Sequence, residues 1–370
     1  MSLFYDDPVH LVRGEGVWLW DADGRKYLDC YNNVPHVGHC HPRVVEAITR
    51  QASMLNTHTR YLHEGILDYV ERLTATFDKS LNAAILTCTG SEANDVALRM
   101  AQAVTGKTGV IATNHTYHGN TTAVSQLSTR MPPVGGFGGH VRHVPAPDSY
   151  RPLGGEGGDA FATAFAAEVE KAIASLQDTP HGFSAIIIDP FFANEGFPDL
   201  PPGFLDKTVA AVRKAGGLVI TDEVQPGFGR TGSHMWGHQP AGIVPDIVTL
   251  GKPMANGHPV GGVIANVDTI NASARHSAIS IPSAAIRSPV RLPWRCSMSS
   301  RMKNSSRMPA MSANTPAMPS SGWRRSIRSS AMCAAAACSW ARNSFWTGKR
   351  RSRPLPRRHA SSTPCANAAC

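Results

Sequence analysis

Every acidic residue of this 370-residue chain lies before residue 276, and this break decides which part of the chain can build a folded core. Residues 1–275 hold all 27 Asp and Glu and 20 Lys and Arg, whereas residues 276–370 hold 16 Lys and Arg and no acid. The first part carries a formal charge of −7 and the second +16. A basic segment dominated by Ser, Ala, Arg and Pro cannot bury enough apolar surface to fold alone. We therefore expect the folded domains within residues 1–275.

The composition of residues 276–370 is what a shifted reading frame produces from a gene rich in G and C. Of these residues, 73 have codons with G or C in the second position, and only eight require A there. Undoing a one-base slip across residues 277–289 permits the text Phe-Gly-Tyr-Phe-Asn-Thr-Phe-Gly-Gly-Asn-Pro-Val-Ser. We interpret residues 276–370 as an out-of-frame, largely disordered tail. The alternative is a genuine basic arm that binds nucleic acid electrostatically, and we do not expect nucleic acid as a partner.

Residues 1–275 alternate between apolar runs and helical periodicity, which predicts an α/β fold. The apolar runs expected as strands are residues 83–88, 110–113, 185–189, 217–221 and 246–250. The periodic segments expected as helices are residues 41–54, 64–77, 94–104, 161–176 and 204–214. This order favours a mostly parallel sheet covered by helices, with the chemistry at the carboxyl ends of its strands. The Gly- and Pro-rich residues 132–158 are expected to form a long loop.

The chain shows no export or membrane signal. It has no run of about 18 apolar residues, and its first 13 residues contain acids rather than a basic start followed by an apolar stretch. We therefore expect a cytoplasmic protein without a membrane partner. Cys30, Cys40 and Cys88 have no paired metal-ligand spacing, so no metal site is expected.

A Gly-Ser turn follows the first expected strand of the sheet and opens a helix. Gly90 and Ser91 offer bare backbone N–H groups, a hydroxyl and the positive end of a helix dipole, which together can hold a phosphate. The alternative is a plain helix cap, in which Ser91 or Thr89 caps the helix and Glu92 is favourable in its first turn.

An aromatic residue flanked by histidines follows the next expected strand. Tyr117 can lie flat against a planar cofactor ring, and Gly119 allows the backbone to approach closely. The alternative is a polar loop without a ligand.

Two further strand ends carry ionisable side chains. Asp222 and Glu223 end a buried strand, where an acid needs a partner and is either part of an ion pair or a site residue. Lys252 follows a later strand and is either a solvated turn lysine or a desolvated amine able to form a Schiff base. A phosphate turn, a stacking aromatic, a strand-end acid and a strand-end lysine, in that order, describe a pyridoxal phosphate site.

Residues 1–275 resemble the class III aminotransferases, which are fold type I pyridoxal-phosphate enzymes. The resemblance is carried by Gly38-His39-Cys40-His41-Pro42, residues 89–94, Tyr117-His118-Gly119, Asp222-Glu223-Val224-Gln225, Gly227-Phe228-Gly229-Arg230-Thr231-Gly232 and Gly251-Lys252-Pro253. Residues 31–42 and 56–64 look most like the branch that holds the ethanolamine-phosphate phospho-lyases and their aminotransferase relatives.

The resemblance implies a fold type I large domain in residues 46–275 and an incomplete small domain, whose N-terminal segment is residues 1–45. It implies a homodimer that transfers an amino group from an amine or amino acid to a 2-oxo acid. A phospho-lyase acting on an amino-alcohol phosphate is the alternative on the same cofactor.

The resemblance also assigns roles to the site residues. Lys252 would form the Schiff base with pyridoxal 5′-phosphate and move the proton between the substrate Cα and the cofactor C4′. Asp222 would pair with the pyridinium nitrogen. The other implied cofactor contacts are Gly90 and Ser91 at the phosphate, Tyr117 on the ring face, Gln225 at the ring hydroxyl, and His118.

The sequence departs from the family pattern at two places. Residues 189–195 replace the usual Glu-Pro-x-x-Gly-Glu strand end, so the glutamate gate is expected to be displaced or absent. The family takes a phosphate-binding threonine from the neighbouring subunit, in an Asn-Thr-Phe-Gly-Gly-Asn-Pro segment that the printed chain lacks. We therefore expect this chain to bind the cofactor weakly or not at all.

Overall fold

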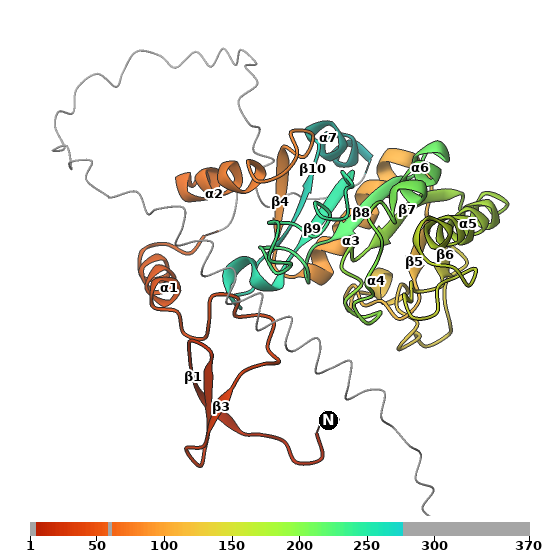
Figure 1. Cartoon of the computed structure of the whole chain (residues 1–370). Helices are drawn as coiled ribbons and strands as arrows, with labels where there is room; N and C mark the ends of the chain where they lie inside the picture. The colour runs from red at the N-terminus through yellow and green to blue at the C-terminus, as the bar shows by residue number, and fades with distance from the viewer. Residues whose placement is uncertain (1–4, 58–60, 277–370) are drawn as a thin grey trace, which may run out of the picture.

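The computed structural model describes residues 5–57 and 61–276 (Figure 1). The proposed out-of-frame tail lies outside these residues, apart from the backbone of His276. The strands are β1 (Leu11–Glu15), β2 (Trp18–Asp21), β3 (Lys26–Leu28), β4 (Ala83–Thr87), β5 (Gly109–Thr113), β6 (Val141–Val144), β7 (Phe183–Ile188), β8 (Leu218–Asp222), β9 (Ile247–Leu250) and β10 (Gly261–Ala265). The helices are α1 (Pro42–Met54), α2 (Glu64–Thr74), α3 (Gly90–Thr105), α4 (Thr122–Ser125), α5 (Gly158–Gln177), α6 (Asp206–Lys214), the 3₁₀ helix η1 (Lys252–Ala255) and α7 (Val267–His276).

Seven strands form one sheet in the order β4-β10-β9-β8-β7-β5-β6. Strands β9, β8, β7, β5 and β6 pair in parallel, and β10 is antiparallel to both β9 and β4. Since β4 and β9 are both antiparallel to β10, β4 runs in the same direction as β9. The predicted mostly parallel α/β sheet is confirmed, and the carboxyl ends of six strands meet at one edge.

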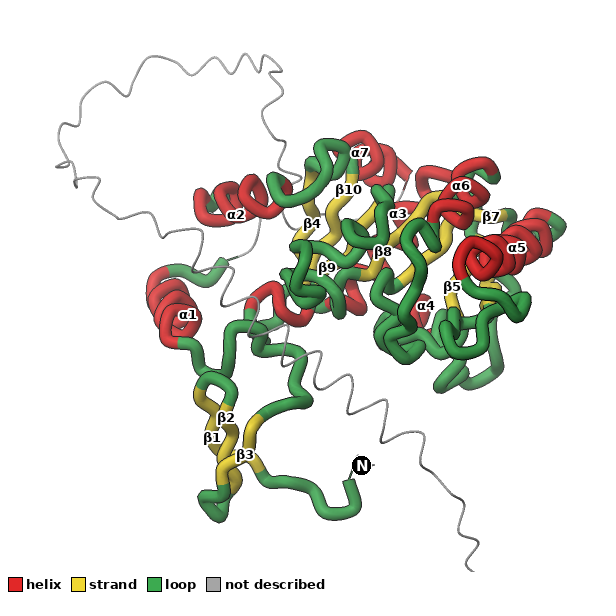
Figure 2. The backbone as a smooth tube through the Cα atoms, in the orientation of Figure 1, coloured by secondary structure: helices red, strands yellow, loops and turns green. Residues whose placement is uncertain are grey.

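Helices cover both faces of this sheet, which explains why its central strands are apolar throughout (Figures 1 and 2). Alternate residues of β7 belong to different clusters. Ala185 and Ile187 pack in the core that includes α3 and Ile270 of α7. Ile186 and Ile188 pack on the opposite face, in the core that α5 and α6 cover. A third cluster fills the face beside β4 and β10, with α2 and the buried Trp236. The sheet is thus a rigid platform for the loops at its carboxyl edge.

Two strands of the seven-stranded sheet, β6 and β10, and the three N-terminal strands were not predicted from the sequence. The expected loop of residues 132–158 contains β6, a four-residue edge strand paired with β5. Its Val-Arg-His-Val pattern buries only the two valines, and the flanking glycines and prolines conceal so short a strand. Strand β10 begins with Gly261 and Gly262, which carry no side chain and weaken the strand signal.

The N-terminal segment forms a separate three-stranded antiparallel sheet, β1-β2-β3, next to α1. A backbone bridge between Gly16 and His39 joins the sheet to the loop that leads into α1. Helix α1 has no buried residue. The boundary at residue 45 between small and large domains stays a prediction. Within the described part of the chain, no helix is long and apolar enough to cross a membrane.

Candidate functional site

Four loops converge at the carboxyl edge of the sheet, as expected for a parallel α/β fold. Strand β4 leads to the first turn of α3, and β5 leads to the loop that carries Tyr117 and His118. Strand β8 ends at Asp222, and Lys252 begins η1 two residues after β9. The structure thus brings the four sequence motifs to one edge of the sheet.

Asp222 is buried and held by three donors. Its Oδ2 lies 2.7 Å from Nδ1 of His118 and accepts a hydrogen bond of 2.8 Å from Nδ2 of Asn94. Its Oδ1 accepts the backbone N–H of Val224 at 3.0 Å. A carboxylate accepts hydrogen bonds, so Nδ1 of His118 carries the proton, while Nε2 lies 3.0 Å from Oγ1 of Thr116. These three contacts fix the position of the carboxylate at the strand end.

Lys252 lies in a confined place close to this acid. Its Nζ donates to Oε1 of Gln225 at 2.8 Å, and the same oxygen accepts from Nδ2 of Asn33 at 3.0 Å. Burial lowers the pKa of the Lys252 amine, and the charges of Asp222 and Asp189 act in the opposite direction. Its φ of +37° is unusual for a residue with a side chain and shows that its surroundings hold this conformation.

The turn before α3 contains the helix cap that the sequence offered as one alternative. Thr89 caps the helix, because its Oγ1 accepts from the backbone N–H of Glu92 at 3.1 Å. The Glu92 carboxylate in turn accepts the N–H of Cys88, the residue before the cap, at 2.8 Å. Capping therefore falls to Thr89 and leaves the Ser91 hydroxyl for another partner.

Ser91 and three glycines pack closely around the start of α3. The Ser91 Oγ accepts the backbone N–H of Asn120 at 3.1 Å. A Cβ on Gly119 would lie 2.4 Å from that Oγ, and a Cβ on Gly251 would lie 3.0 Å from the backbone nitrogen of Gly90. Only residues without a side chain let these loops meet, which brings backbone N–H groups together at the positive end of the helix.

Tyr117 lies at the accessible rim of this site. The residue is 44% exposed, and its hydroxyl donates to Oδ1 of Asn120 at 3.0 Å. Tyr117 is therefore not packed in the core.

The two strand-end carboxylates have different surroundings. Glu223 is fully buried and accepts the backbone N–H groups of Gly237 and His238 at 2.7 and 2.8 Å. Its Oε1 also lies 2.8 Å from Nδ1 of His238. Asp222 is thus the acid at the candidate site, whereas Glu223 fixes the turn behind it.

Residues 189–195 place two further acids near the site. Asp189 is buried and accepts the N–H groups of Phe191 and Ala193. Burial raises the pKa of Asp189 well above its usual range, and the nearby charges of Glu195 and Asp222 raise it further. Glu195 accepts from Oγ1 of Thr113 at 2.5 Å, and burial raises its pKa as well. The Glu195 carboxyl is therefore fixed at the end of β5.

Sequence reasoning missed an arginine clamp on the N-terminal loop. Arg230 donates from Nε to the backbone oxygen of Gln225 at 2.7 Å and from an Nη atom to the backbone oxygen of Asn33 at 2.6 Å. The same guanidinium group lies 3.2 Å from Nδ1 of His36. Arg230 lies in a motif of the resemblance, but its partners Asn33 and His36 lie almost 200 residues away in sequence, so no local pattern predicts this role.

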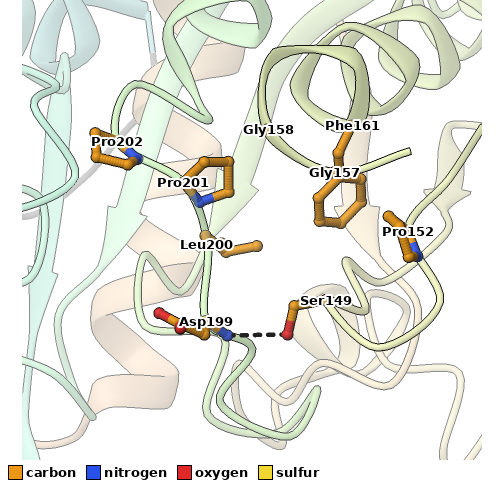
Figure 3. A pocket seen from close by; sticks show the side chains of 9 residues that line it. All are labelled: Ser149, Pro152, Gly157, Gly158, Phe161, Asp199, Leu200, Pro201 and Pro202. Carbon is orange, nitrogen blue, oxygen red and sulfur yellow. Dashed lines mark hydrogen bonds between the residues drawn. The ribbon is translucent and has the colours of Figure 1, made fainter. Parts of the chain in front are cut away.

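A hollow of about 330 Å³ lies between the start of α5 and the loop after β7 (Figure 3). It is lined by Ser149, Pro152, Gly157, Gly158, Phe161, Asp199, Leu200, Pro201 and Pro202. Asp199 is its single ionisable lining residue, and it shares no residue with the cluster around Asp222. The hollow therefore adds nothing to the chemistry at the strand ends.

The residues at the strand ends fit pyridoxal 5′-phosphate. Asp222 supplies a carboxyl group suited to a protonated ring nitrogen, and Lys252 supplies an amine whose pKa burial lowers. The glycine cradle at α3, which a Cβ would fill, suits a phosphate group.

Comparisons with known proteins agree with this geometry. The family described as "Aminotransferase class-III" matches residues 5–278. The alanine–glyoxylate aminotransferase 2-like protein of Drosophila melanogaster is 39% identical over 273 residues, which are 71% of this chain and 55% of that protein. The ethanolamine-phosphate phospho-lyase homolog 1 of Caenorhabditis elegans is 37% identical over 71% of this chain and 59% of its own length. The chain thus spans little more than half of these relatives.

Solved structures show the same likeness. A phospholyase from Arthrobacter in complex with phosphoethanolamine is 46% identical, with a TM-score of 0.70, over 75% of this chain and 65% of that one. An omega-transaminase from Thermomicrobium roseum is 28% identical, with a TM-score of 0.67, over 76% of this chain and 65% of that one. A relative from Pseudomonas jessenii was solved with pyridoxamine phosphate, abbreviated PMP. With its fold, its strand-end site and its matched residues in agreement, the chain belongs to the class III aminotransferase family of pyridoxal-phosphate enzymes.

Proposed function

We propose that Lys252 is the catalytic amine of a pyridoxal-phosphate enzyme that acts on the amino-bearing carbon of its substrate. The observation that carries this proposal is a half-buried lysine, with a pKa lowered by desolvation, close to an acid that accepts three hydrogen bonds. When bound, pyridoxal 5′-phosphate supplies an electron sink for negative charge at the substrate carbon. Lys252 would hold the cofactor and then remove and return the proton at that carbon.

The other residues bind and orient the cofactor. Asp222 would hold a proton at the ring nitrogen, and its three donors fix its position for that purpose. Gln225, already bonded to Nζ of Lys252, would contact the ring hydroxyl. The remaining proposed contacts are Gly90 and Ser91 at the phosphate, Tyr117 on the ring face, and His118 through Asp222.

The reaction proposed first is amino-group transfer from an amine or amino acid to a 2-oxo acid, in a cytoplasmic homodimer. It is supported by the family match and by the transaminases among the similar structures. Two relatives, from Arabidopsis thaliana and Homo sapiens, are named mitochondrial. The proposed cytoplasmic location therefore needs its own test, which is imaging of the expressed chain.

Elimination of phosphate from an amino-alcohol phosphate is the second candidate. The phospholyase of Arthrobacter is 46% identical to this chain, against 28% for the omega-transaminase of Thermomicrobium roseum. Both reactions begin with proton removal by the same lysine, so the strand-end geometry serves either. They differ in what they release, because elimination needs no 2-oxo acid.

We further propose that the printed tail impairs this chemistry. The segment that would carry the partner's phosphate-binding threonine falls in the shifted frame, at residues 277–289. A phosphate that lacks one of its donors is held more weakly. The printed chain should therefore bind the cofactor less tightly than a version in which the one-base slip is undone, which we call the restored-frame version.

One experiment tests these proposals together. Both versions are incubated with pyridoxal 5′-phosphate, reduced with borohydride and digested, and the modified lysine is located by mass spectrometry. Labelling of Lys252, its loss in Lys252→Ala and its retention in the exposed-lysine control Lys214→Ala are expected. An unlabelled Lys252 in the restored-frame version refutes the proposed enzyme. Phosphate released from phosphoethanolamine without a 2-oxo acid identifies the lyase, and amine consumed only with a 2-oxo acid identifies the transaminase.

A further inference from the structure

We propose that Asn94, held by Thr249, is a positioning residue that keeps both Asp222 and His118 in place. The inference rests on the proposed function, because it assigns Asn94 and Thr249 to the support of the cofactor's acid. Asn94 lies in the helix that starts at Gly90, so one rigid element links the phosphate turn to the ring-nitrogen acid.

The Asn94 side chain has one orientation that satisfies its neighbours. It is fully buried, and its Oδ1 accepts from the Thr249 hydroxyl at 2.6 Å. Its Nδ2 then donates to Oδ2 of Asp222 at 2.8 Å and to the backbone oxygen of His118 at 2.7 Å. A flipped amide would place Oδ1 against two acceptors and would turn Nδ2 toward the Thr249 hydroxyl. The two acceptors therefore set the direction of the Asn94 amide, and the Thr249 hydroxyl holds its oxygen end in place.

The amide acts on two members of the site at once. One N–H adds a donor to the carboxylate of Asp222, and the other fixes the backbone of the residue that supplies the second donor, His118. Loss of the amide would remove one hydrogen bond from Asp222 and loosen the imidazole that makes another. Since hydrogen bonds to charged groups are stronger than neutral ones, we expect a sizeable effect from this one side chain.

A purely structural role makes a different prediction. If Asn94 only tied α3 to β9, its loss would lower stability without changing the His118–Asp222 bond or the cofactor affinity of the folded protein. The test therefore compares stability with two readouts at the site.

The first readout needs no cofactor. The full printed chain is labelled with ¹⁵N-histidine, and the downfield resonance of the His118 Nδ1 proton is assigned by its loss in His118→Gln. We expect Asn94→Leu and Thr249→Val to shift this resonance or broaden it by faster exchange, and Thr249→Ser to keep it. The matched control is Thr208→Val, because Thr208 is also fully buried and its hydroxyl has no hydrogen-bond partner.

The second readout is the affinity of the restored-frame version for pyridoxal 5′-phosphate, followed by absorbance. A loss of roughly tenfold or more is expected for Asn94→Leu and Thr249→Val, with recovery in Thr249→Ser and no change in Thr208→Val. If Asn94→Leu does not fold, Thr249→Val decides the question. An unchanged His118 resonance together with affinity within twofold of the parent, in a folded Thr249→Val, overturns the inference.

The failure of the proposed function would look different. In that case the resonance of His118 still responds to Asn94→Leu, but Asp222→Asn binds pyridoxal 5′-phosphate as tightly as the parent and Lys252 stays unlabelled. That result removes the cofactor role of the cluster. A cofactor effect without a resonance effect instead overturns the proposed route through His118.

Discussion

Nδ1 of His118 lies 2.7 Å from Oδ2 of Asp222, and both side chains are buried at the carboxyl edge of the sheet. The pair joins the loop after β5 to the end of β8, across 104 residues of sequence. Because a buried carboxylate is costly without donors, this bond offsets part of the cost of burying Asp222 at the strand end. The same bond fixes which imidazole nitrogen carries the proton.

Asp222 and Glu223 are adjacent carboxylates with separable roles. In the restored-frame version, Asp222→Asn should lower activity by about 100-fold or more, because the developing charge loses its electrostatic partner. Glu223→Gln should instead lower the free energy of unfolding by about 1–3 kcal/mol, since two backbone N–H groups and His238 lose a charged acceptor. Steady-state kinetics and urea unfolding of both variants check this. If both variants lost activity equally when compared at the same folded fraction, the assignment of separate roles to Asp222 and Glu223 would be wrong.

The close approach of Gly119 to Ser91 makes a steric prediction. A Cβ at Gly119 would lie 2.4 Å from Ser91 Oγ, and the residue has φ of +137°. Gly119→Ala should therefore lower the free energy of unfolding by about 1–3 kcal/mol and weaken cofactor binding. Gly106→Ala is the control, because Gly106 also has a positive φ but nothing within 4 Å of its added Cβ. Calorimetry measures the stability of both variants, and titration measures their affinity for the cofactor. If both substitutions had equal effects, the contact with Ser91 would add no cost and the prediction would be wrong.

The strand-end site was predictable because its members follow local patterns. Asp222, Lys252 and the Gly90 turn each come directly after an apolar run, and parallel strands bring such positions to one edge. The support of the site was not predictable, because it depends on contacts between distant elements. Asn94 and Thr249 are 155 residues apart, and no periodicity relates them. The same limit hid β6 and β10, whose short runs become strands only through their neighbours.

The pH dependence of stability should report the buried acid Glu195. Burial raises its folded-state pKa above 4.5, so the folded state binds more protons than the unfolded state as pH rises from 4.5 toward the folded value. Stability is therefore lost as pH rises through that window. Glu195→Gln should flatten this decline, and Asp189, whose pKa burial also raises, should account for a further part. Urea unfolding between about pH 4.5 and 8 measures it, with the exposed Glu156→Gln as control. A decline as steep as in the parent would rule out a buried, protonated Glu195.

The titration of Lys252 should make stability change with pH in the opposite direction. Burial lowers its folded-state pKa below the unfolded value of 10.5, so the unfolded state binds more protons between these two values. Stability of the cofactor-free chain should therefore rise with pH across that window, and below it the buried ammonium group is a constant cost. Lys252→Met should remove the rise and increase the free energy of unfolding at neutral pH, because the methionine side chain needs no desolvation of a charge. The exposed Lys214→Met should change neither. Urea unfolding from about pH 7 to 10 measures both effects. If the Lys252→Met chain were less stable than the parent at pH 7, the attraction of the ammonium group to its acidic neighbours would exceed its desolvation cost, which would contradict the prediction.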